Sequence, residues 1–88
     1  MDDKIKRDKA VALKYKKGEK ASPQVVARGG GVVAEKIQQV AQENQIPLYN
    51  DKQLVEQLIR LEVSERIPPE LYKAVAEVLV FVYSMDRE

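Results

Sequence analysis

Apolar residues in the middle of the chain follow two different periods. Short apolar runs occupy residues 25–27 and 46–49, and residues 32–44 between them carry apolar side chains at helical spacing. Short β-rich runs on either side of a helical segment predict a strand, a crossover helix and a second strand parallel to the first. The segment from the glycines to Gln45 is long enough for such a crossover, and nearly all crossovers are right-handed. This βαβ unit is the centre of the predicted fold.

Three further elements surround this unit. Residues 9–15 alternate between apolar and other side chains, which predicts a strand, and Pro23 suits the start of the next strand. Residues 52–61 and 69–85 carry apolar side chains at helical spacing, and residues 64–67 are predicted to connect those two helices. The fold class is therefore α/β: one small domain with a mixed three-stranded sheet, a βαβ crossover and three helices.

The length and composition limit the possible classes of protein. Eighty-eight residues allow one domain, which we place at residues 9–88 after a flexible segment of residues 1–8. The chain is 44% hydrophobic and 33% charged, as in folded globular proteins. No apolar run approaches the roughly 18–20 residues of a membrane-spanning helix, and no signal-peptide pattern opens the chain. We therefore predict a cytoplasmic protein without direct membrane insertion.

The sequence offers little to catalysis or to metal binding. It contains no cysteine and no histidine, so thiolate sites and the commonest general base and metal ligand are excluded. The hydroxyl groups of its serines and tyrosines have no histidine to activate them. We therefore predict no enzyme activity, no catalytic residue, no cofactor and no metal site.

The net charge of +1 hides an uneven distribution. Residues 1–20 hold eight lysines and arginines against four acids, whereas residues 21–88 hold seven against ten. A basic segment can contact nucleic acid or an acidic protein surface. Because Tyr15 is its one aromatic residue, the segment lacks the aromatic platforms of single-strand binders, and nucleic-acid binding is not expected.

Three consecutive glycines, Gly29, Gly30 and Gly31, precede the crossover helix. Free backbone N–H groups at a helix N-terminus attract anions, so a small anion- or nucleotide-binding protein is the alternative function. The spacing fits neither of the glycine-rich phosphate-binding motifs, and a tight strand-to-helix turn that needs a positive φ explains the glycines equally well. Both explanations stay open on the sequence alone.

Five passages of the chain together resemble one protein family. They are AVALKY at residues 10–15, SPQVVARG at 22–29, AEKI at 34–37, AQENQIPL at 41–48 and IPPELYKAVAEVL at 67–79. Their order and spacing are similar to those of the cytoplasmic C-terminal domain of the FlhB family. The members of this family are export-switch proteins of flagellar and injectisome type III secretion. Residues 9–88 are accordingly expected to form an FlhB C-terminal-like domain.

The resemblance also implies what this chain does not do. Family members carry a membrane domain and cleave themselves within an Asn-Pro-Thr-His motif, which should lie just before the first strand. Residues 5–8 are Ile-Lys-Arg-Asp instead, so self-cleavage is not expected. The chain resembles the fragment left after cleavage, made without the membrane domain.

The function implied by the resemblance is a non-enzymatic protein-binding module of the export apparatus that substitutes for this fragment in substrate-specificity control. The expected partners are the membrane-embedded export-gate protein, other flagellar or type III export components and export substrates, and recruitment to the membrane apparatus would follow. One edge of the sheet would be free to pair with an extended segment of the gate protein or with residues 1–7. The expected partner-binding residues are Lys14, Tyr15, Pro23, Gln24 and Arg28.

Overall fold

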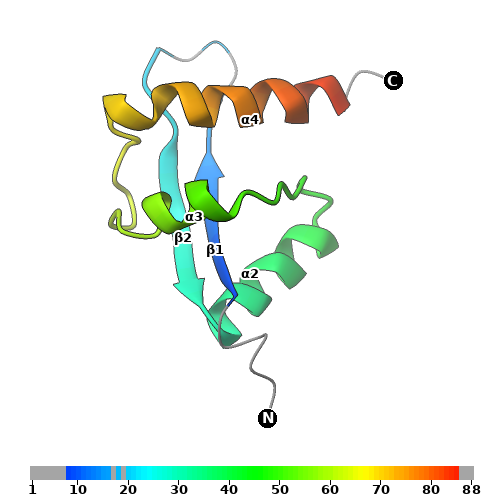
Figure 1. Ribbon diagram of the computed structural model, residues 1–88. Coiled ribbons are helices and arrows are strands. Elements are labelled where there is room, and N and C mark those ends of the chain that lie inside the picture. The colour runs from blue at the N-terminus through cyan, green and yellow to red at the C-terminus, as the bar shows by residue number, and fades with distance from the viewer. Residues whose placement is uncertain (1–7, 17, 19, 86–88) are drawn as a thin grey trace.

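The computed structural model describes residues 8–16, 18 and 20–85 (Figure 1). The flexible segment predicted for residues 1–8 lies outside this range except for Asp8, whose carbonyl oxygen accepts a hydrogen bond from the Gly31 N–H at 2.9 Å. The elements are, in chain order, strand β1 (Lys9–Lys14), strand β2 (Gln24–Gly30), helix α2 (Val32–Glu43), helix α3 (Lys52–Leu58), the 3₁₀ turn η1 (Pro69–Leu71) and helix α4 (Tyr72–Met85).

The sheet is an antiparallel ribbon of β1 and β2. The register places Lys9 opposite Gly30 and Lys14 opposite Gln24, with an irregularity after Ala12 that leaves Val26 as an extra residue on β2. Such a bulge bends the strand and increases its twist. The predicted strand at residues 9–15 is confirmed, and the predicted strand at residues 25–27 is part of the longer β2.

The predicted third strand is wrong. Residues 46–50 form no strand, and the sheet of the described residues has two strands. The Ile46 N–H donates to the carbonyl oxygen of Ala41 at 2.8 Å and so closes the end of α2, and Pro47 has no N–H to donate. Two consecutive residues of the segment are thereby lost as ladder donors. The predictions of a mixed sheet and of a βαβ crossover depend on this strand and are therefore also wrong. The prediction of a small α/β domain with three helices is confirmed.

A different segment lies along the outer edge of β2. Residues 64–67, predicted to be a plain connection, form an isolated antiparallel bridge between Arg66 and Gln24. The Val25 N–H donates to the Glu65 carbonyl oxygen at 2.9 Å, and the Ser64 N–H donates to the Val25 carbonyl oxygen at 2.7 Å. The outer edge of β1 has no ladder partner among the described residues. Pairing of an export-gate segment with that edge stays a prediction, and residues 1–7 lie outside the description.

The two faces of the ribbon are packed differently. On one side α3 and α4 meet the ribbon in a cluster of large aliphatic residues; its buried members are Val25, Leu54, Leu58, Ile67 and Val75. The buried residues of α2, which contacts both strands, are Ala34 and Ala41. Val33 of the same helix is about half exposed, and its side chain lies close to Gly29.

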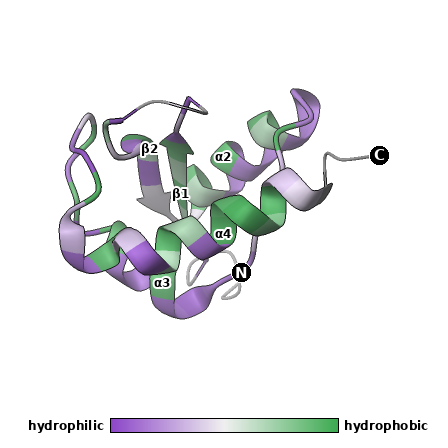
Figure 2. Cartoon of the chain, turned by 90° about the horizontal axis from the view of Figure 1, so that it is seen from above, coloured by the Kyte–Doolittle hydropathy of each residue, from purple (hydrophilic) through white to green (hydrophobic). Residues whose placement is uncertain are grey.

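The helix ends follow their capping residues. The Asp51 carboxylate accepts the Leu54 N–H at 3.1 Å and begins α3, and the Asn44 side chain donates to the Val40 carbonyl oxygen at 2.8 Å at the end of α2. Pro69 begins the 3₁₀ turn that leads into α4. Hydrophobic residues cover most of α4 (Figure 2), and some remain exposed, including Val80 at 65%.

Candidate functional site

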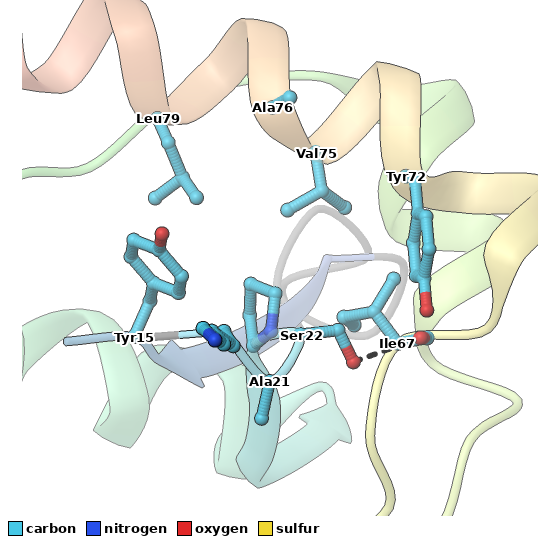
Figure 3. A pocket seen from close by; sticks show the side chains of 10 residues that line it. Tyr15, Ala21, Ser22, Ile67, Tyr72, Val75, Ala76 and Leu79 are labelled. Atoms are coloured by element: carbon cyan, nitrogen blue, oxygen red, sulfur yellow. Dashed lines mark hydrogen bonds between the residues drawn. The ribbon is translucent and has the colours of Figure 1, made fainter. Parts of the chain in front are cut away.

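An apolar pocket of about 260 Å³ lies between α4 and the loop that enters β2. Figure 3 shows Leu79, Val75 and Tyr72 pointing from α4 toward the side formed by Tyr15, the loop and Ile67. The lining residues are Tyr15, Lys20, Ala21, Ser22, Pro23, Ile67, Tyr72, Val75, Ala76 and Leu79. The pocket thus joins two stretches, residues 15–23 and 67–79, that are far apart in the sequence.

Hydrogen bonds fix the loop side of the pocket. The Ser22 hydroxyl donates to the Ile67 carbonyl oxygen at 3.1 Å, and the Ile67 N–H donates to the Pro23 carbonyl oxygen at 2.9 Å. The Arg66 guanidinium donates to the Ser22 carbonyl oxygen at 2.6 Å. Pro23 and Ile67 are both buried. These bonds tie residues 22–23 to residues 66–67, so this side of the pocket is preformed.

Helix α4 supplies the other side. Tyr72, Ala76 and Leu79 follow one another at the spacing of one helical face, next to Val75, which is buried in the core. Because Val75 anchors the helix to the ribbon, the position of this face is fixed by the core. Tyr72 and Ala76 are exposed and Leu79 is half-buried, so the face is open to a partner.

The chemistry of the lining suits an apolar group. Among the described residues, the lining contains no carboxylate, one cation, Lys20, and three hydroxyl groups, those of Tyr15, Ser22 and Tyr72. Sites that are mainly apolar with a few polar groups bind apolar ligands and orient them through those groups. The volume lies below the about 300–1,000 Å³ usual for small-molecule sites, so the pocket fits a single apolar side chain of a partner better than a cofactor.

The five predicted partner-binding residues separate into three groups. Tyr15 and Pro23 line the pocket. Lys14 and Gln24 are their sequence neighbours outside it, and the Gln24 amide donates to the Ser64 carbonyl oxygen at 2.8 Å, which helps to hold residues 64–67 on β2. Arg28 does not belong to the pocket: its guanidinium pairs with the Glu62 carboxylate at 3.4 Å. A partner-binding role for Lys14, Gln24 and Arg28 stays a prediction.

The sequence analysis did not identify the α4 side of the pocket. The Phe81 ring, also on α4, does not line the pocket and meets the Tyr49 ring edge-to-face with centroids 5.1 Å apart. A signal was available. Tyr72 and Ala76 extend the apolar face of α4 beyond the residues that the core needs.

The three glycines do not form an open anion cradle. Gly29 and Gly30 belong to β2, and the N–H of Gly31 is already bonded to Asp8. A Cβ at Gly29 would lie 2.3 Å from Cγ1 of Val33, and Gly31 has φ 59°, so close packing and backbone conformation explain these two glycines. Glu35, an acid in the first turn of α2, further disfavours an anion. The anion-binding alternative receives no support from this geometry.

One carboxyl group is electrostatically perturbed, away from the pocket. Lys9 Nζ donates to both carboxylate oxygens of Glu56, at 2.8 and 3.0 Å, and this hydrogen bond holds the pKa of Glu56 below its ordinary value of 4.5. The pair is exposed to solvent and connects β1 to α3. Its role is structural.

The chain is similar to a known protein family and to several of its members. The model of the FlhB HrpN YscU SpaS family matches residues 7–82. The protein YlqH of Bacillus subtilis (strain 168) is 41% identical over 79 residues, which are 90% of this chain and 85% of that protein. The flagellar biosynthetic protein FlhB of Yersinia enterocolitica is 44% identical over 79 residues, which are 89% of this chain. The chain spans about a fifth, 21%, of the length of that FlhB.

Solved structures agree with these matches. The cytoplasmic domain of FlhB from Shewanella putrefaciens superimposes with a TM-score of 0.82 and 34% identity over 90% of this chain and 65% of that one. The PscU C-terminal domain superimposes with a TM-score of 0.77 and 31% identity over 83% of this chain and 94% of that one. In the part of the chain that the structure describes, no helix is both long and apolar enough to cross a membrane.

Proposed function

Because the chain belongs to the FlhB HrpN YscU SpaS family, we propose that it is a non-enzymatic protein-binding module of the flagellar or type III protein export apparatus. It takes the place of the FlhB domain that it matches and contributes to the choice of exported substrates. It acts in the cytoplasm and is recruited to the membrane-embedded export-gate protein. The match of residues 7–82 to the family, and of almost the whole chain to FlhB domains, supports this role.

The observation that carries the proposal is the preformed apolar pocket between α4 and residues 20–23. A binding module needs a surface that keeps its shape without its partner, since ordering a flexible surface costs affinity. The hydrogen bonds of Ser22, Pro23 and Ile67 provide that rigidity on one side, and the burial of Val75 provides it on the other. The partner inserts an apolar side chain, contributed by an export component or by an export substrate.

The test uses a flagellated bacterium whose FlhB is truncated before the domain that this chain matches. The chain is expressed there from a plasmid, and swimming in soft agar and the proteins exported to the medium are measured. We expect swimming and export to be restored. No recovery, with the chain present at normal levels, would overturn the proposed substitution.

A pair of α4 variants links the result to the pocket. Ala76→Glu places a carboxylate in the lining, whereas Lys73→Glu places one at an exposed position of the same helix that does not line the pocket. We expect Ala76→Glu to abolish the recovery and Lys73→Glu to retain it, with equal melting temperatures for the two purified variants. Full recovery with Ala76→Glu would remove the pocket from the mechanism.

A further inference from the structure

The segment around the pocket carries charge of mainly one sign. Residues 14–23 hold four lysines and one glutamate. Lys20 lines the pocket, and Lys14 and Lys16 lie on either side of Tyr15, which also lines it. All three lysines are exposed. Lys20 therefore adds a positive charge to a mainly apolar lining, and Lys14 and Lys16 add charge on the chain next to Tyr15.

None of these lysines is neutralised within the described part of the protein. The ion pairs found there join Lys9 to Glu56 and Arg28 to Glu62, away from the pocket. The lining residues that the structure describes include no carboxylate. The positive charge of Lys20 thus remains available to a partner.

From this arrangement we infer that the partner segment carries an acidic residue next to the apolar side chain that fills the pocket, and that Lys20 binds its carboxylate, with Lys16 adding to the attraction. This inference rests on the proposed function and specifies its binding site. An apolar side chain that enters the pocket removes water from around Lys20, and a cation that loses water without gaining a partner costs free energy. A neighbouring carboxylate compensates through a charge-assisted hydrogen bond.

The expected size of the effect is modest, because Lys20 is exposed and its side chain is flexible. Exposed ion pairs contribute little each, and charge at an interface rim acts mainly on specificity and on the association rate. Replacing the acidic residue of the partner by its amide should weaken binding by about threefold to tenfold at low salt. The difference should shrink at high salt, because exposed charges are screened.

The experiment is a selection of short random peptides, displayed on phage, against four forms of the protein. The forms are the wild type, the double variant Lys16→Glu/Lys20→Glu, the pocket variant Ala76→Glu, and Lys36→Glu as a charge control on α2, which does not line the pocket. We expect wild type and Lys36→Glu to enrich a large apolar residue with an acidic neighbour. The double variant should keep the apolar residue and enrich a basic neighbour, and Ala76→Glu should enrich neither.

The outcomes separate the two proposals. If the wild type enriches no apolar residue, the pocket does not bind partners and the proposed site fails. If it enriches an apolar residue without an acidic neighbour, the pocket stands and the present inference is wrong. A selected peptide and its Glu→Gln or Asp→Asn counterpart are then compared by fluorescence anisotropy on the wild type and on Lys16→Gln/Lys20→Gln. The loss of affinity should be seen on the wild type and should vanish on that variant; an equal loss on both would contradict the role of the lysines.

Discussion

Two irregular segments, one on each side of α3, show what decides whether a short apolar run joins a sheet. Residues 46–49 lead into α3 and are more apolar, yet they pair with no strand. Residues 64–67 follow α3 and are mostly polar, yet they lie along β2 and form a bridge with it. The hydrophobic pattern instead predicts that residues 46–49 form a strand and that residues 64–67 only connect two helices. The difference teaches that available backbone donors outweigh apolar composition when the segment is only four residues long.

The backbone hydrogen bonds of the two segments explain this difference. In the second segment the N–H groups of Ser64 and Ile67 both reach carbonyl oxygens at the start of β2, at 2.7 and 2.9 Å. In the first segment the Ile46 N–H is used by the end of α2, and Pro47 has none. The second segment thus places two N–H groups beside carbonyl oxygens at the start of β2, whereas the first two residues of the other segment have no N–H left to offer. It also carries Ile67 into both the core and the pocket wall.

The largest predicted difference concerns the isoleucines of the two segments. Ile67 is 2% exposed and Ile46 is 55% exposed. Ile67→Ala removes buried methyl groups and leaves a cavity, so it should lower the free energy of unfolding by about 2–5 kcal/mol. Ile46→Ala should change it by less than about 0.5 kcal/mol. Urea unfolding followed by circular dichroism measures both, and similar losses for the two variants would contradict the comparison.

The second prediction concerns backbone protection. The amide hydrogens of Val25 and Ile67 are bonded across the β2 edge, to the Glu65 and Pro23 carbonyl oxygens. The Leu48 and Tyr49 amides lie in the segment that joins no strand. In hydrogen exchange followed by NMR, the first pair should exchange at least about 100-fold more slowly than the second. Strong protection of Leu48 and Tyr49 would show that residues 46–49 pair with the sheet in solution.

The sequence predicts those parts of the fold that depend on local pattern. The alternation of residues 9–15 and the apolar helical period of residues 69–85 each predict their element directly. The prediction of a third strand was wrong because a hydrophobic pattern reflects side chains only and does not show which backbone N–H groups are available for strand pairing. Of the candidate site, Tyr15 and Pro23 could be named from the sequence. The broad apolar face of α4 indicates that some of its residues are left over by the core, but only the folded chain shows that Tyr72 and Ala76 are the exposed ones.

The third prediction concerns two residues at chain turns, Gln45 just before residues 46–49 and Ser64 at the start of residues 64–67. Gln45 has φ 59° and Ser64 has φ 81°, so both hold the left-handed conformation that side chains disfavour by about 1–2 kcal/mol. Glycine removes that cost but loses about 0.5–1 kcal/mol of chain entropy. Gln45→Gly and Ser64→Gly should therefore each raise the free energy of unfolding by about 0.5–1 kcal/mol, measured by urea unfolding. Destabilisation by Gln45→Gly would mean that this turn is not the end of α2 that the backbone shows.

The smallest predicted effect concerns the hydrogen bond between Lys9 and Glu56, which connects β1 to α3. The hydrogen bond from Lys9 lowers the pKa of Glu56, so the folded protein takes up this proton less readily than the unfolded chain. The stabilisation is therefore complete above the ordinary pKa of 4.5 and is lost as the pH falls through the lower, folded value.

Glu56→Gln should accordingly flatten the dependence of stability on pH below about pH 5, because it lowers stability slightly at neutral pH, where the hydrogen bond is fully present, and changes it little at low pH, where Glu56 would be protonated. Lys9→Gln removes the same hydrogen bond from the other partner, so it should flatten the curve similarly, and the double variant should add nothing further. Thermal unfolding across this pH range measures all three. If Glu56→Gln left the curve unchanged while Lys9→Gln flattened it, the proton would belong to another carboxyl group, and α3 would be held beside β1 by its buried leucines, Leu54 and Leu58, alone.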